Sequence, residues 1–175
     1  MAAALALRRA MLDDLATLRR WDDEPDVAAA GGEDGAFAWE RELPRVVGWR
    51  ELLMAEIDGR PVGFVKIIDC AREETHYWGD VAGNLRAIDI WIGAAENRGH
   101  GYGTRMMHLA LARCFADPSV GAVLVDPLAS NTCAHAFYER QGFIRVERHS
   151  FGPDDCYVYR LERPTWEQQP ARRKK

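Results

Sequence analysis

The sequence predicts an α/β (α+β) fold, with a mixed central β-sheet of about six to seven strands flanked by helices. Strand and helix patterns alternate over residues 85–150, a hairpin pattern precedes them, and one further strand pattern follows. The chain has 175 residues, enough for one substantial core but too few for two ordinary domains. We therefore expect a single domain over 1–164 and a basic, disordered tail over 165–175.

The first elements are a short strand and a helix. Residues 5–9 fit a strand, and residues 11–20 fit a helix because Leu12, Leu15 and Leu18 recur on one of its faces. Residues 22–45 have no clean period and contain several prolines and glycines, so we expect a loop with one short helix.

A hairpin is predicted next. Residues 52–57 and 62–68 have strand composition, and Asp58-Gly59 between them tolerates a positive φ. A polar loop follows over 71–84.

The second half of the chain has a strand-helix-strand-helix-strand order. We expect a strand over 85–93, a helix over 103–115, a strand over 121–125, a helix over 132–141, a strand over 143–150, and a last strand over 156–161 antiparallel to its predecessor.

The charge pattern narrows the class of partner. The formal charge is −4, but four positive charges lie in 171–175, so the rest of the chain carries −8. An acidic body repels nucleic acid and attracts polycations. No apolar run approaches the roughly 20 residues that span a bilayer, and no signal-peptide pattern is present, so we predict a cytoplasmic protein without nucleic-acid or membrane partners.

No metal site is predicted. The cysteines, at positions 70, 114, 133 and 156, are widely spaced and show no zinc-finger pattern, so we interpret them as reduced thiols. The histidines, at positions 76, 100, 108, 135 and 149, show no metal-ligand spacing.

A glycine-rich turn joins the strand over 85–93 to the next helix. The segment Arg98-Gly-His-Gly-Tyr-Gly-Thr104 places unobstructed backbone N–H groups at a helix N-terminus, where they can bind phosphate oxygens. A P-loop would end in Gly-Lys-Ser/Thr, and a dinucleotide-binding turn would have its third glycine one residue later. The turn could also serve only as a tight connection.

The following helix carries a second pattern. In the segment from Asn131 to Phe143, Asn131 or Thr132 can cap the helix, Ala134 permits close approach, and Gly142 can end it in the left-handed conformation.

These two segments resemble the GCN5-related N-acetyltransferases, the GNAT superfamily. Arg98-x-x-Gly-x-Gly103 is similar to its Q/R-x-x-G-x-G/A signature, and the Asn131 segment is similar to its N-x-x-A-x-x-F/Y-Y-x-x-x-G-F block. The resemblance implies acetyl-CoA as co-substrate. It implies these cofactor-binding residues: Ile90, Trp91, Ile92, Arg98, Gly99, His100, Gly101, Tyr102, Gly103, Thr104, Asn131 and Ala134.

The resemblance also implies that Tyr138 protonates the leaving thiolate. A phenol of pKa about 10 is protonated at neutral pH and suits that step. Alternatively, Tyr138 is a core tyrosine whose hydroxyl bonds locally.

Asp89 is the predicted base. It lies between Ile88 and Ile90 and shares a strand face with Trp91, so it would be partly desolvated and could take a proton from an amine. Alternatively, its carboxylate is satisfied by backbone or by a neighbouring arginine.

Within the family, the chain looks similar to aminoglycoside 6'-N-acetyltransferases, which confer antibiotic resistance. The resemblance rests on Ile88-Asp89, Asp117-Pro118 and Asp126-Pro-x-x-Ser-Asn131. It implies substrate contacts by Asp89 and Asp126, and by the weaker candidates Trp21, Glu24, Asp80 and Asp154. Lys66 departs from the pattern, because it would repel a polycation if it faced the site.

Other acceptors stay open. They include hydroxylysine in siderophore assembly and protein N-termini, and a non-catalytic acyl-CoA-binding module is a rival from another class. We expect a monomer or a homodimer.

Overall fold

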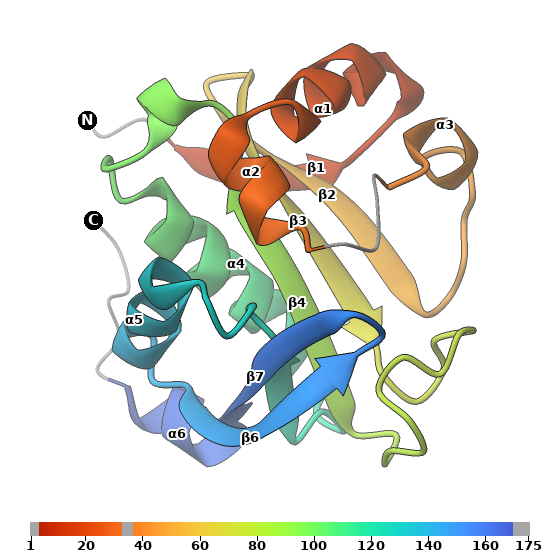
Figure 1. The fold of residues 1–175 in the computed structure, drawn as a ribbon, viewed down its shortest axis with the longest axis vertical. Helices are drawn as coiled ribbons and strands as arrows, with labels where there is room; N and C mark the ends of the chain where they lie inside the picture. The colour runs from red at the N-terminus through yellow and green to blue at the C-terminus, as the bar shows by residue number, and fades with distance from the viewer. Residues whose placement is uncertain (1–3, 33–36, 170–175) are drawn as a thin grey trace.

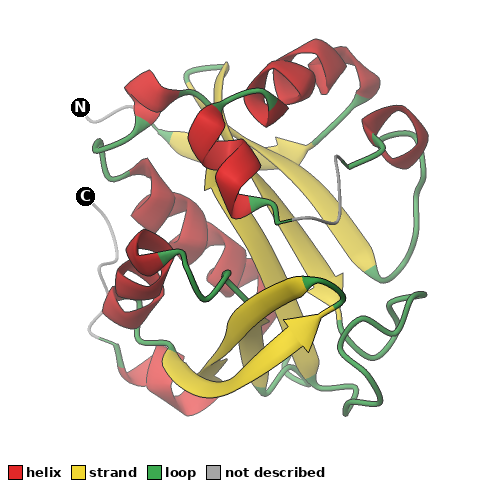
Figure 2. Ribbon diagram, in the orientation of Figure 1, coloured by secondary structure: helices red, strands yellow, loops and turns green. Residues whose placement is uncertain are grey.

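The computed structural model describes residues 4–32 and 37–169, which form one mixed sheet with helices on both faces (Figures 1 and 2). Within them the sheet has seven strands in the order β1-β2-β3-β4-β5-β7-β6. The strands are β1 Leu5–Arg9, β2 Arg50–Ile57, β3 Arg60–Asp69, β4 Leu85–Ile92, β5 Ala122–Val125, β6 Ile144–Phe151 and β7 Asp154–Glu162. This confirms the predicted fold class.

Six α-helices accompany these strands in the described ranges. They are α1 Leu15–Asp22, α2 Pro25–Ala30, α3 Trp39–Glu42, α4 Tyr102–Phe115, α5 Thr132–Arg140 and α6 Arg163–Gln168, with 3-10 turns at Leu12–Asp14 and Ala95–Asn97. None of the helices in these ranges is long and apolar enough to cross a membrane.

Two segments differ from the sequence prediction. The described residues within 22–45, which leave out 33–36, contain two short helices instead of one. Pro25 starts α2, and the Trp39 side chain, 2% exposed, anchors α3 in the core. Helix α6 begins two residues before the predicted tail, with Pro164 in its first turn and the Trp166 ring 6.0 Å from that of Phe115. The remainder of the predicted tail, 170–175, lies outside the described residues.

The alternation of side chains along β4 divides the core. Ile88 packs into the cluster between the sheet and α4, which includes Met106 and Leu111. Trp91 packs on the opposite face, beside Trp39 and the other residues of α1 and α3. The prediction that the isoleucines of this strand share one face is confirmed.

Strands β4 and β5 diverge after a short parallel contact. Their pairing runs only from Leu85↔Ala122 to Ala87↔Leu124, and β5 ends one residue later. Residues 88–92 therefore have no strand neighbour on that side. On the other side, β4 pairs with β3 without a register shift, so β4 contains no bulge. The divergence opens the middle of the sheet, and the candidate site lies there.

Candidate active site

The glycine turn follows β4 and leads into α4, as predicted. Gly99 and Gly101 both have positive φ, 76° and 75°, and Gly101 is the residue before the first turn of α4. A side chain at either position would meet no atom within 4 Å, so the glycines are required by the backbone conformation and not by crowding. No side chain caps α4. Its first amides are therefore available to an anion.

Two side chains of the turn have local partners. The His100 ring lies 3.1 Å from the Glu96 carbonyl oxygen and stacks on Tyr102, with ring centroids 5.5 Å apart. Thr104 accepts a hydrogen bond from Gln141 at 3.4 Å, which ties α4 to the end of α5. The side chains therefore fix the turn while its backbone faces outward.

Arg98 connects this turn to α2. Its guanidinium pairs with Asp26 and lies 4.0 Å from a Glu24 carboxylate oxygen. Its Nη2 atom is buried without a hydrogen-bond partner among the described residues. Glu24, predicted from the sequence as a substrate contact, is thus placed beside the predicted cofactor turn.

Helix α5 is built as its sequence predicts. The Asn131 side chain accepts a hydrogen bond from the Ala134 amide at 3.1 Å, and Gly142 has a φ of 93° just beyond the helix. Ala134 is half-buried and packs against the main core.

Tyr138 of α5 is 8% exposed, and its ring contacts Phe143 and Tyr159. No described residue hydrogen bonds to its hydroxyl, so the alternative of a locally bonded core tyrosine is not supported. Burial raises the pKa of this hydroxyl, and the charges of Asp89 and Asp126 raise it further. Tyr138 therefore stays protonated at neutral pH and lies within electrostatic reach of both carboxylates.

The divergence of the strands brings two carboxylates together. Asp89 lies on the unpaired half of β4, and Asp126 directly follows β5. Burial raises the pKa of Asp126 to about 7, and the charge of Asp89 contributes in the same direction. This pair, 37 residues apart in sequence, is the acidic centre of the site.

Lys66 lies beside this pair. It is opposite Asp89 in the β3–β4 register, and its Nζ atom is 2.5 Å from Asp89 Oδ2. Lys66 therefore faces the acidic centre, which answers the question left open by the sequence. The partner of Asp89 is this lysine and not an arginine.

Tyr77 is a site residue that the sequence analysis did not identify. It comes from the loop between β3 and β4, and its hydroxyl donates a 2.6 Å hydrogen bond to Asp126. Its ring stacks on Phe151 of β6, with centroids 4.3 Å apart. The only sequence signal was an aromatic pair, Tyr77-Trp78, within an otherwise polar loop.

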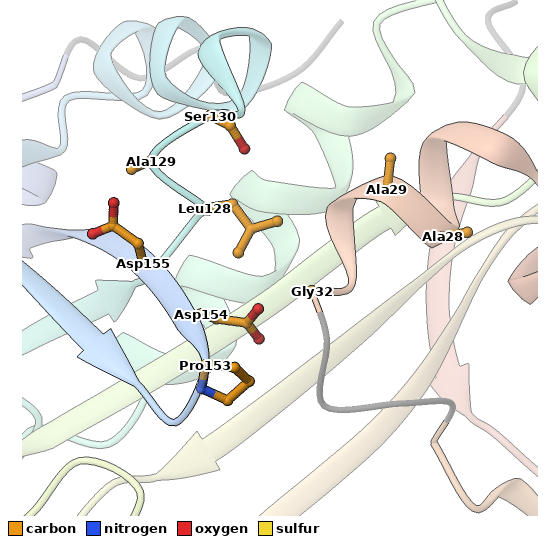
Figure 3. A pocket seen from close by; sticks show the side chains of 9 residues that line it. All are labelled: Ala28, Ala29, Gly32, Leu128, Ala129, Ser130, Pro153, Asp154 and Asp155. Atoms are coloured by element: carbon orange, nitrogen blue, oxygen red, sulfur yellow. The ribbon is translucent and has the colours of Figure 1, made fainter.

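A cavity of about 380 Å³ lies between α2, the loop before α5 and the start of β7 (Figure 3). Its lining residues are Ala28, Ala29, Gly32, Leu128, Ala129, Ser130, Pro153, Asp154 and Asp155. The Asp154 side chain points toward Gly32, and a Cβ there would lie 2.2 Å from its Oδ2 atom. Asp154 thus gives this cavity an acidic wall, and its role as a substrate contact stays a prediction.

Two other predicted substrate contacts differ in their surroundings. Trp21 is 2% exposed and packs against Gly93, where a Cβ would lie 1.9 Å from its ring. We therefore correct its assignment from substrate contact to core residue, because its apolar ring fills the space under β4. Asp80 is exposed in the same loop as Tyr77, and no described residue forms an ion pair with it.

The acetyltransferase (GNAT) domain family matches residues 10–151, most of the chain. The chain belongs to this family. The predicted superfamily is therefore confirmed, and the matched range contains the turn before α4 and the Asn131 block. No group of three metal-binding side chains occurs in the described part of this GNAT domain.

The chain is also similar in sequence to an acetyltransferase and to a resistance protein. The chain is 28% identical over 167 residues to the aminoglycoside N(6')-acetyltransferase type 1 of Klebsiella pneumoniae, covering 91% of this chain and 83% of that protein. It is 33% identical over 78 residues to a kanamycin resistance protein of Rhizobium radiobacter, covering 45% of this chain and 71% of that protein.

Solved structures share the fold. The structure of AAC(6')-Ib in complex with ribostamycin and coenzyme A has a TM-score of 0.86 at 24% identity, covering 97% of this chain and 99% of that chain. A spermidine N-acetyltransferase from Vibrio cholerae, solved with CoA and spermine, has a TM-score of 0.74 at 16% identity, covering 93% and 98%.

Proposed function

We propose that this GNAT protein transfers the acetyl group of acetyl-CoA to a primary amine of an aminoglycoside, at the 6'-amine. The observation that carries the proposal is the placement of Asp89 on the unpaired half of β4 and of Asp126 directly after β5, with Tyr138 within electrostatic reach of both. The family supports the acetyl transfer, and the names of the relatives support the acceptor.

The residues at the turn fit acetyl-CoA. The uncapped amides of α4 suit a pyrophosphate, and so does the Arg98 Nη2 atom, which has no hydrogen-bond partner among the described residues. The open edge of β4 at Ile90, Trp91 and Ile92 would suit an extended pantetheine arm, and Asn131, which caps α5, and Ala134 on α5 would be further contacts. When bound, the co-substrate supplies an activated acetyl group as a thioester.

The chemistry requires a base and an acid. The acceptor's amine nitrogen forms a bond to the carbonyl carbon of the acetyl thioester, and the bond between that carbon and the sulfur of coenzyme A breaks. Asp89 takes the proton that the amine loses, directly or through water. Tyr138 gives its proton to the departing thiolate, which its raised pKa permits because the hydroxyl stays protonated until that step.

Acidic side chains would orient the acceptor. Asp126 holds a second ammonium group, and Asp154 extends the acidic surface along the cavity. The formal charge of −8 outside the tail draws a polycation toward the protein. We propose a cytoplasmic enzyme, monomeric or homodimeric, that acts without nucleic-acid or membrane partners.

Release of free thiol from acetyl-CoA, with kanamycin or tobramycin as acceptor, tests this proposal. We expect turnover with both, and at least a hundredfold loss in Asp89→Asn. Asp13→Asn is the matched control, because it is the same type of change in the 3-10 turn before α1. It should keep the wild-type rate.

Hydroxylysine, spermidine and a peptide with a free N-terminus serve as rival acceptors. Turnover with one of these acceptors and not with aminoglycosides would show that the acceptor is not an aminoglycoside and would identify the acceptor class. Binding of acetyl-CoA without turnover of any amine would favour the non-catalytic module.

A further inference from the structure

Lys66 is an internal cation in a site that otherwise attracts cations. Its Nζ atom is 2.5 Å from Asp89 Oδ2, the distance of a direct ion pair. An acceptor ammonium bound at Asp89 would lie at a similar distance. Lys66 and such an ammonium group therefore compete for the same carboxylate.

The surroundings of Lys66 hold it in this place. Strand register sets its Cα directly opposite that of Asp89. The Phe37 ring lies 5.4 Å from Nζ, within the range of a cation–π contact. The Lys66 side chain is 21% exposed, so its ammonium group is partly withdrawn from water. The charge is therefore a fixed part of the site.

Lys66 forms an ion pair with only one of the two carboxylates of the acidic centre, Asp89. Asp89 has a lysine partner, whereas in the described ranges Asp126 has one side-chain hydrogen-bond donor, the neutral hydroxyl of Tyr77. Of the two carboxylates, Asp126 has the greater unbalanced negative charge once it ionises. A second ammonium on the same ring as the reacting amine would be repelled by the positive charge that Lys66 holds at Asp89.

We propose that Lys66 is a specificity-determining residue, which selects acceptors whose acetylated sugar ring carries a hydroxyl and not a second ammonium at the 2' carbon. This inference rests on the proposed function. It narrows the acceptor class from aminoglycosides in general to those with fewer ammonium groups on the acetylated ring.

Kanamycin A and kanamycin B provide a matched pair of probes. They differ only at the 2' carbon of the ring that bears the 6'-amine, where kanamycin A has a hydroxyl and kanamycin B an amine. The measured quantity is the ratio of kcat/KM for kanamycin B to that for kanamycin A. Lys66→Gln should raise this ratio about tenfold, a difference of about 1.4 kcal/mol. Lys66→Met should raise it similarly, because it also removes the charge.

Two controls separate charge from other effects. Lys66→Arg keeps a cation and should keep the wild-type ratio. Arg60→Gln removes a positive charge at the exposed start of the same strand and should also leave the ratio unchanged. Circular dichroism of each variant identifies any that does not fold, and either Lys66→Gln or Lys66→Met suffices for the test.

An unchanged ratio in the folded Lys66→Gln or Lys66→Met variant, with turnover of both kanamycins, overturns the role of Lys66 and leaves the proposed function intact. Absence of turnover with either kanamycin in wild type and all variants refutes the proposed function, and the inference then fails with it.

Discussion

Asp126→Asn is the substitution whose consequences follow most directly from the structure. Burial and the charge of Asp89 raise the pKa of this carboxyl from 3.8 to about 7 in the folded protein. In the unfolded chain it ionises near the ordinary value. An acid with a raised folded pKa contributes stability below the unfolded pKa, and that contribution is lost as pH rises through the folded pKa. The relevant window is therefore between about pH 4 and pH 7.

The size of the effect follows from the two pKa values. They differ by about three pH units, and each unit corresponds to about 1.4 kcal/mol, so ionised Asp126 costs the folded state about 4 kcal/mol at most. Asparagine cannot ionise. The free energy of unfolding of Asp126→Asn, minus that of wild type, should therefore increase by about 4 kcal/mol or less between about pH 4 and pH 8.

Urea unfolding at about pH 4, 6 and 8 measures this difference. Asp80→Asn is the control, because Asp80 is exposed and forms no ion pair with a described residue; its difference from wild type should not change with pH. A difference between Asp126→Asn and wild type that stays constant from pH 4 to pH 8 would refute the reasoning. In the same window the KM of wild type for kanamycin should fall as pH rises, because ionised Asp126 attracts an ammonium group, and Asp126→Asn should lose this dependence.

Three other substitutions test separate parts of the account. Tyr138→Phe should lower kcat about a hundredfold with little change in the KM for acetyl-CoA, in steady-state thiol-release assays, because it removes the acid but not the binding surface; an unchanged kcat would exclude Tyr138 as the acid. Asp26→Asn removes a carboxylate that would compete with the phosphates of acetyl-CoA for Arg98. It should lower the KM for acetyl-CoA two- to threefold at low salt in the same assays. An increase in this KM would mean that the Arg98–Asp26 ion pair orders the turn. Gly93→Ala should lower stability by about 1–3 kcal/mol in thermal unfolding because its methyl group overlaps the Trp21 ring, and a wild-type melting temperature would contradict that packing.

The strands and helices of the second half could be predicted from sequence because local signals agree there. Gly101 and Gly142 mark one helix start and one helix end by their need for positive φ, and Asn131 caps the second helix. The predicted boundaries lie within a few residues of the observed ones. Helix α6 was missed because its stability comes from the packing of Trp166 on the core, which is a tertiary contact.

The acidic centre was predictable only in part. Asp89 and Asp126 could be named from their motifs, but their proximity depends on where β4 and β5 cease to pair. Strand alternation could not decide which way Lys66 faces, since that depends on the register with β4. Trp21 was assigned as a contact from the family resemblance, and its burial could not be predicted because it depends on tertiary packing against Gly93.

The identity of the product tests the central claim most directly. Wild-type protein is incubated with acetyl-CoA and kanamycin A, and the product is analysed by mass spectrometry and NMR. The account predicts one added acetyl group, located on the 6'-amine, with release of one equivalent of free thiol. Acetylation at another amine, or on a hydroxyl, would contradict it, as would recovery of unmodified kanamycin from a protein that binds acetyl-CoA.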